Sequence, residues 1–99
     1  MATRIILYWR DIPTQVICRE RRVAAKRELG ERFALAVDAA AMVAGMAGAD
    51  AYLDQWRRGA PEPCGDDLEA EADAAARALE ARFDQATLAA YVKAGGSAP

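Results

Sequence analysis

The sequence predicts an α+β protein, in which an N-terminal antiparallel β-hairpin is followed by three to four helices that pack on it. Two observations carry this prediction. Residues 4–20 are rich in β-branched and aromatic side chains, which favour strands. From residue 30 onward, apolar residues recur at helical spacing, and 25 of the 99 residues are Ala, the strongest helix former. The length suits a single domain, assigned to residues 1–96, with residues 97–99 as a disordered tail.

The hairpin is predicted over about 4–10 and 14–20. Both faces of its first strand are apolar, with Ile5, Leu7 and Trp9 on one face and Ile6 and Tyr8 on the other. We therefore expect this strand to be covered on both sides or to pair at a subunit interface. Pro13 fixes the turn between the strands, and Val16 and Cys18 should point inward from the second strand.

The segment after the hairpin, residues 19–27, is a basic connector that the sequence leaves open between a strand and a short helix. A central helix is then predicted over about 30–46, ending at Gly45 or Gly48. Its apolar stripe has helical spacing and comprises Leu29, Phe33, Val37, Ala40 and Ala44, widened by Leu35, Met42 and Met46.

Three further helices are predicted over about 50–57, 66–83 and 85–94. Asp50 and Asp84 are the expected N-caps of the first and the last. The glycines and prolines of residues 57–65 indicate a loop between the first and the second. The helix over 66–83 begins with acidic residues, which suit a helix N-terminus. Its expected inward stripe is Leu68, Ala72, Ala75, Leu79 and Phe83.

The composition points to a thin core and a partner. Apolar residues make up 54% of the chain, but Ala buries little area, and a domain of this size is marginal in buried surface. The net charge of −2 divides into +3 for residues 1–58 (ten Lys/Arg, seven Asp/Glu) and −5 for residues 59–99 (three against eight). Such polarity can pair the two halves of one molecule or bring molecules together, so a homodimer or larger homo-oligomer is one expectation.

Several chemistries are disfavoured by the residues themselves. The chain has no histidine and one serine, Ser97, so Ser-His-Asp and Cys-His catalysis are excluded within it. Cys18 and Cys64 match no metal-binding spacing. We expect no enzyme, no metal and no cofactor. No apolar run approaches the about 18 residues of a membrane span. Two free thiols without a secretory signal favour a cytoplasmic protein, with Cys18 buried and Cys64 exposed.

Two segments are candidate partner-binding surfaces. The strand end at residues 8–13 concentrates aromatics beside a charge pair, which is typical of interface anchors and equally of a small protein's core. The basic connector could bind phosphate groups or remain a solvated face that pairs with the acidic half. The candidate residues are Tyr8, Trp9, Arg10, Asp11, Arg19, Arg22, Lys26 and Arg27.

Several short segments form a set that is distinctive in its order along the chain: Tyr8–Pro13, Gln15–Ile17, Ala25–Leu29, Glu31–Phe33, Asp50–Leu53 and Trp56–Arg57. Together they resemble a family of small proteobacterial proteins called virulence factors. The resemblance covers about residues 4–95. It implies a short intracellular protein with an accessory or subunit role, the expected partner being a larger one-carbon-metabolism enzyme that uses folate or a corrinoid. It assigns no catalytic residue.

These observations favour a non-catalytic interaction or accessory module. One alternative is a subunit or binder of an anionic cofactor such as a folate or a nucleotide, held by Arg10, Arg19, Arg22 and Lys26. A second, nucleic-acid binding, is disfavoured by the acidic isoelectric point and by the lack of a recognised motif.

Overall fold

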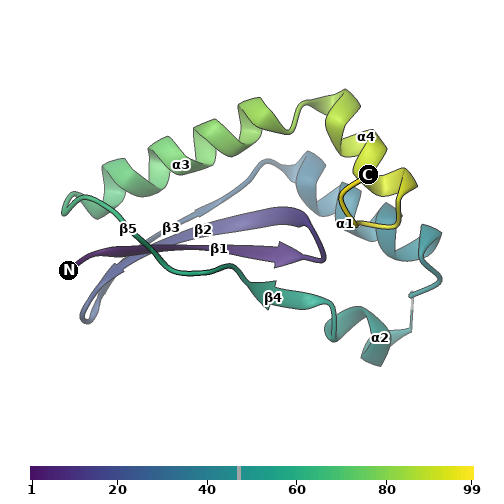
Figure 1. Ribbon diagram of the computed structural model, residues 1–99, viewed down its shortest axis with the longest axis horizontal. Helices are drawn as coiled ribbons and strands as arrows, with labels where there is room; N and C mark the ends of the chain where they lie inside the picture. Colours follow the sequence, from purple (N-terminus) through teal and green to yellow (C-terminus); the bar gives the residue numbers. More distant parts are fainter. Residues whose placement is uncertain (47) are drawn as a thin grey trace.

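The chain begins with antiparallel strands and ends with helices, so the predicted α+β class is confirmed (Figure 1). The computed structural model describes residues 1–46 and 48–99. Its elements are β1 (Thr3–Trp9), β2 (Ile12–Glu20), β3 (Val23–Glu28), α1 (Glu31–Val43), α2 (Ala49–Leu53), β4 (Trp56–Arg58), β5 (Glu62–Pro63), α3 (Leu68–Arg82) and α4 (Gln85–Lys93).

The strands form one antiparallel sheet in the order β3-β2-β1-β4, with β1 in its interior. Two short strands pair with the edge of β1 that faces away from β2. β4 pairs with its C-terminal half and β5 with its first residues. The register between β1 and β2 shifts between Leu7 and Tyr8. This bulge leaves Thr14 between the pairs Leu7–Gln15 and Tyr8–Pro13.

The basic connector is a strand. β3 pairs with β2 along its whole length, and Glu20 lies opposite Val23. Arg21 and Arg22 therefore form a two-residue hairpin turn, in which Arg21 has a left-handed φ of 56°. The open question left by the sequence is thus answered by backbone pairing between neighbouring strands.

The turn of the first hairpin lies earlier than predicted. Pro13 was expected to fix it, but Pro13 pairs with Tyr8 inside β2. Arg10 and Asp11 form the turn, and Arg10 has a left-handed φ of 53°.

Two later boundaries also differ from the prediction. The helix expected over 50–57 ends at Leu53, because Trp56 pairs with Trp9 as the first residue of β4. The loop expected over 57–65 contributes β5 in addition to the end of β4. In both cases the unpaired edge of β1 supplies backbone groups that the segment satisfies by pairing. Neither pairing can be predicted from the local sequence.

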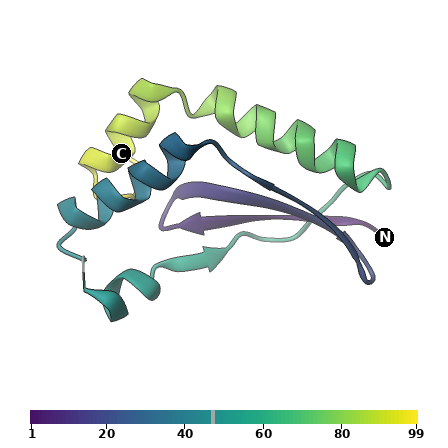
Figure 2. The ribbon, with the colours of Figure 1, turned by 180° about the vertical axis from the view of Figure 1, so that it is seen from behind.

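The helices pack mainly on one side of the sheet. α3 crosses β2 and β3, whereas α1 packs on α4 and on β2 at the end of the sheet where the β1–β2 turn lies (Figures 1 and 2). The predicted stripe of α3 points inward, although Ala75 is only half-buried and Ala76 is buried. The stripe of α1 is narrower than expected: Leu35 and Met42 are 59% and 73% exposed, because α1 has neighbours on one side.

Aspartate side chains cap the N-termini of α3 and α4. Asp67 caps α3 by accepting a hydrogen bond of 3.2 Å from the N–H of Ala70. Asp84 caps α4 in the same way through the N–H of Thr87, at 2.8 Å. The expected cap at Asp50 is wrong, since α2 begins one residue earlier and its N-cap, Gly48, offers no side chain.

None of the helices in the described ranges is both long and apolar enough to cross a membrane.

The two faces of the sheet are different. Cys18 and Val16 of β2 and Ala25 of β3 belong to the buried core under the helices. Cross-strand partners share a face, so the alternate residues of each strand form the opposite face. We call this the open face; it comprises Thr3, Ile5, Leu7, Gln15, Ile17, Arg19, Lys26 and Glu28. The sequence predicted that both faces of β1 are covered. Helices cover the core face, whereas on the open face they cover only the end of β1 beside α1.

Candidate functional site

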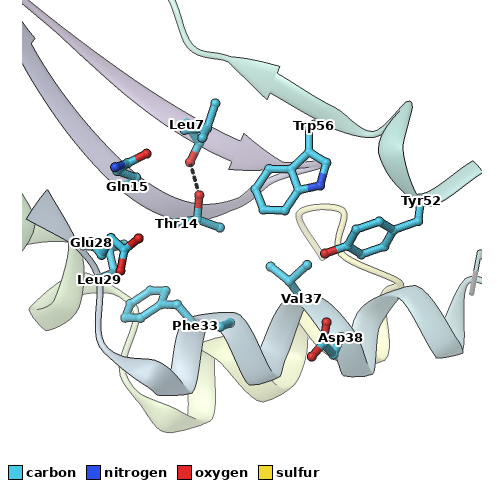
Figure 3. Close-up of a pocket in the computed structure, with 11 residues that line it drawn as sticks. Leu7, Thr14, Gln15, Glu28, Leu29, Phe33, Val37, Asp38, Tyr52 and Trp56 are labelled. Atoms are coloured by element: carbon cyan, nitrogen blue, oxygen red, sulfur yellow. Dashed lines mark hydrogen bonds between the residues drawn. The ribbon is translucent and has the colours of Figure 1, made fainter. Parts of the chain in front are cut away.

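The open face ends in a hollow of about 340 Å³ between the sheet, α1 and the corner from α2 to β4 (Figure 3). Side chains from separate elements of the first two thirds of the chain meet there. Leu7, Thr14, Gln15 and Glu28 come from the sheet. The helix α1 contributes Phe33, Val37 and Asp38, and the corner contributes Tyr52 and Trp56. A hollow of this volume lies at the small end of ligand-sized pockets.

The sheet side of the hollow is organised by the bulge in β1 and β2. The Thr14 hydroxyl donates a hydrogen bond of 3.0 Å to the carbonyl oxygen of Leu7. The carbonyl of Thr14 in turn accepts from the N–H of Leu29, also at 3.0 Å. The residue left unpaired by the register shift therefore ties β1 to the segment that enters α1.

The α1 side of the hollow is a fixed apolar wall. Phe33 and Val37 are almost fully buried, and the ring of Phe33 meets that of Phe83 edge-on at 6.3 Å. Buried side chains held by such contacts occupy single rotamers. Asp38 follows Val37 and is exposed at the rim, so α1 presents one carboxylate above an apolar wall.

The corner from α2 to β4 is held by aromatic contacts. The rings of Tyr52 and Trp9 lie 5.7 Å apart, and those of Tyr52 and Trp56 meet edge-on at 6.1 Å. The indole N–H of Trp9 donates to the carbonyl oxygen of Tyr52 at 2.9 Å. Tyr52 and Trp56 are half-buried, so part of each ring remains accessible beside the hollow (Figure 3).

The charges around the hollow are negative. Glu28 and Asp38 are its two ionisable carboxylates, and the lining contains no Lys or Arg. Among the residues that the structure describes, neither carboxylate takes part in an ion pair. The nearest cations by register are Lys26, two residues before Glu28 on the same face, and Arg58, which is opposite Leu7. This arrangement can bind a ligand, and it has no nucleophile paired with a base.

The aromatic segment at residues 8–13 is mostly internal. Trp9 is 0% exposed and belongs to the core. Arg10, at a left-handed φ of 53°, donates to the Gln55 side chain and to the carbonyl oxygen of Gly95, each at 3.1 Å. The sequence left two roles open for these residues, packing in the core or anchoring an interface. The structure shows the packing role for both.

Tyr8 and Asp11 line a second, more polar hollow of about 350 Å³ together with Arg57, Arg82 and Tyr91. The Arg57 guanidinium stacks over the Tyr8 ring at 4.5 Å. It also contacts Asp11 at 3.0 Å. The second carboxylate oxygen of Asp11 accepts from the N–H of Ala98 at 2.7 Å, so the segment predicted as a tail makes a contact here.

The four basic candidates divide into two groups. Arg27 contacts Glu69 at 2.7 Å and Asp73 at 3.9 Å on α3, and the hydrogen bond to Glu69 raises the pKa of Arg27. This is the pairing between the basic and acidic halves that the sequence suggested. Arg19, Arg22 and Lys26 are exposed, without an ion pair in the described part of the chain. Arg19 and Lys26 lie on the open face.

The two cysteines are neighbours in space. Cys18 is buried, as predicted, whereas Cys64 is half-buried against the core, so the expectation that it is exposed was wrong. Cys64 follows β5, and its N–H donates to the carbonyl oxygen of Ala2 at 3.1 Å. Burial, reinforced by the adjacent Cys64 thiol, raises the pKa of Cys18 to about 11, so this thiol is a poor nucleophile at neutral pH.

Sequence reasoning missed the hollow. Its lining comes from β1, β2, β3, α1 and the α2–β4 corner, and no short segment contains more than a few of these residues. One signal was available in the sequence. In a strand, Lys26 and Glu28 point to one face and Ala25 and Arg27 to the other. Trp56 could not be found in this way, since the sequence placed it in a helix.

The sheet, its helices and this hollow define the protein as a small α+β domain. The model of the family described as Virulence factor matches residues 7–92. Because this match spans most of the chain, the protein belongs to the Virulence factor family. No curated protein and no solved structure gives a significant match.

Proposed function

We propose that this protein is a non-catalytic interaction module that binds a protein partner across the open face of its sheet. The observation that carries the proposal is the one-sided packing of the fold. α3 covers the core face, while Ile5 and Leu7 are only half-buried on the opposite face, beside Ile17, which is 9% exposed. Apolar groups gathered on one sheet face favour association, since burial against a partner removes them from water.

Charge supports the same surface. Arg4 and Arg27 have acidic neighbours within this chain, Glu62 at 3.8 Å and Glu69 at 2.7 Å. Arg19 and Lys26 border the apolar residues of the open face and lack such a neighbour among the described residues. They favour a partner that presents carboxylates at this end of the face.

The test is affinity purification of the tagged full chain from lysate of cells that express it naturally, with quantitative mass spectrometry. The test variant is the double charge reversal Arg19→Glu/Lys26→Glu. The matched control is Arg77→Glu/Lys93→Glu, which reverses two exposed cations on α3 and α4. All four positions are exposed, so the folds should be preserved, as circular dichroism would verify.

The proposal expects one partner, recovered stoichiometrically by the wild-type chain and by the control, and lost from the open-face variant. Recovery by all three chains would place the contact elsewhere. Recovery of the chain only as a homo-oligomer would overturn the assignment to a foreign partner. The one-carbon-metabolism enzymes implied by the family resemblance are the first proteins to look for among those recovered.

A second candidate function, binding of an anionic small molecule such as a folate or a nucleotide, is favoured by the polar hollow. Arg57 and Arg82 both line it, beside Tyr8 and Tyr91, and paired guanidinium groups suit carboxylates and phosphates. Thermal unfolding with folates and nucleotides tests it. A rise in Tm that Arg82→Gln removes is expected; an unchanged Tm at millimolar ligand contradicts it.

A further inference from the structure

The lining of the hollow on the open face has a specific charge pattern. Glu28 at the end of β3 and Asp38 in the second turn of α1 place carboxylates on two different walls. Neither wall supplies a basic side chain. Two carboxylates at the rim of a concave site attract a cation and repel an anion, because low-dielectric walls focus their field.

Aromatic residues line the same hollow as these carboxylates. Trp56 and Tyr52 present half-buried rings beside the hollow, and Phe33 forms its apolar wall (Figure 3). A cation over an aromatic ring is stabilised by the ring quadrupole, and Trp gives the strongest interaction. A planar guanidinium gains more than an ammonium in such a site, since it can stack on a ring and still direct N–H groups towards two carboxylates.

From this combination we infer that the hollow receives the guanidinium group of an arginine side chain of the partner protein. The inference rests on the proposed function, because it assigns one contact within the open face. The apolar stem of the arginine would lie along the half-buried Leu7 and Trp56, and its N–H groups would be directed at Glu28 and Asp38. Arginine is one of the residues enriched among those that dominate binding energy near interface centres.

The test uses an isotope-labelled full chain and two capped amino acids, N-acetyl-arginine amide and the neutral isostere N-acetyl-citrulline amide. We expect saturable NMR shifts at Gln15, Val37 and the Trp56 indole with the arginine compound at low salt, and at least about tenfold weaker binding of the citrulline compound. Equal binding of the two compounds, or no shift up to solubility, overturns the inference.

Variants locate the contact. Glu28→Gln/Asp38→Asn should weaken arginine binding by at least about tenfold, whereas Glu31→Gln/Asp66→Asn, which neutralises two exposed carboxylates outside the lining, should leave it unchanged. N-butylguanidine, which carries the same single charge as the capped arginine, is the third probe. If it binds more than about tenfold tighter than the capped arginine, the hollow is assigned to a small molecule instead.

This inference and the proposed function can fail separately. If Glu28→Gln/Asp38→Asn retains the partner that Arg19→Glu/Lys26→Glu loses, the open face binds a protein and the arginine contact is wrong. If arginine binds the hollow and no partner depends on the open face, the docking proposal is wrong and the hollow is a cation site alone.

Discussion

The indole nitrogen of Trp9 donates a hydrogen bond of 2.9 Å to the main-chain oxygen of Tyr52. Trp9 is fully buried at the end of β1, and Tyr52 forms part of the wall of the hollow on the open face. The largest core residue therefore also fixes the corner from α2 to β4. Stability and the shape of the hollow therefore depend on the same side chain.

Replacing Trp9 by Phe removes this hydrogen bond and part of the buried ring. We expect the free energy of unfolding to fall by about 1–3 kcal/mol, measured by urea denaturation. Trp56→Phe is the matched control: Trp56 is half-buried, so its loss should cost less. Equal effects of the two substitutions would show that the contact between Trp9 and Tyr52 does not hold the corner.

Gly96 packs against the same tryptophan. Its φ of +96° is in the left-handed region, and a Cβ there would lie 2.7 Å from Cζ3 of Trp9. Gly96→Ala should therefore combine backbone strain with a clash, and lower the free energy of unfolding by more than about 1 kcal/mol.

Two other glycines separate strain from contact. Gly45 has a φ of +70°, and a Cβ at this position would meet no atom within 4 Å, so Gly45→Ala should cost only the strain, about 1 kcal/mol. Gly48 has an ordinary φ of −73° and open space, and Gly48→Ala should change stability by less than about 0.5 kcal/mol. Urea denaturation of the three variants should rank Gly96→Ala as the most destabilising, and any other order contradicts the packing of Gly96 on Trp9.

The guanidinium of Arg32, in the first turn of α1, donates to the carbonyl oxygens of Phe83 and Glu80, the latter at 2.7 Å. It thus satisfies carbonyls at the C-terminal end of α3. Arg32→Ala should lower the free energy of unfolding by about 1.5–3 kcal/mol, the range for hydrogen bonds to a charged group.

Arg32→Lys should restore only part of that stability, because an ammonium cannot direct two fixed N–H groups at two carbonyls. Arg77→Ala is the control: Arg77 pairs with Asp73 on the exposed side of α3, and its loss should change stability by less than about 0.5 kcal/mol. An Arg32→Ala chain as stable as Arg77→Ala would rule out the capping role.

The two thiols should differ in reactivity. Cys18 is buried with its pKa raised to about 11, so it should resist alkylation at pH 8 in the folded chain. Cys64 is half-buried and should react first. Mass spectrometry over time should show one modification rapidly and a second only after denaturant is added. Rapid double modification of the native protein would contradict the burial of Cys18.

The same raised pKa predicts a stability change at alkaline pH. In the unfolded chain Cys18 ionises near the ordinary thiol pKa of 9.0, whereas in the folded chain it ionises near 11. Between these values the unfolded state binds fewer protons, so the contribution of Cys18 to stability is present below pH 9 and is lost as pH rises towards 11. The fall in unfolding free energy from pH 8 to pH 10 should be smaller in Cys18→Ala. An unchanged fall would contradict the shift.

Local patterns in the sequence determined the α+β class, the first two strands, the acidic start of α3, the cap at Asp84, and the gross positions of α1, α3 and α4. Each depends on side chains within a few residues of one another: β-branched residues for strands, helical spacing for stripes, and aspartates before helices. Family membership was likewise visible in short segments of the chain.

Tertiary structure alone decided the rest. The edge of β1 drew Trp56 and Glu62 into strands, against the local pattern, because unpaired backbone groups beside a sheet are satisfied by pairing. That pairing turned a predicted helix into one wall of the hollow. It also placed the aromatic corner beside Glu28 and Asp38. These residues become neighbours only after distant segments have packed. A single sequence specifies its elements locally, whereas the proposed docking surface depends on which face the helices leave open.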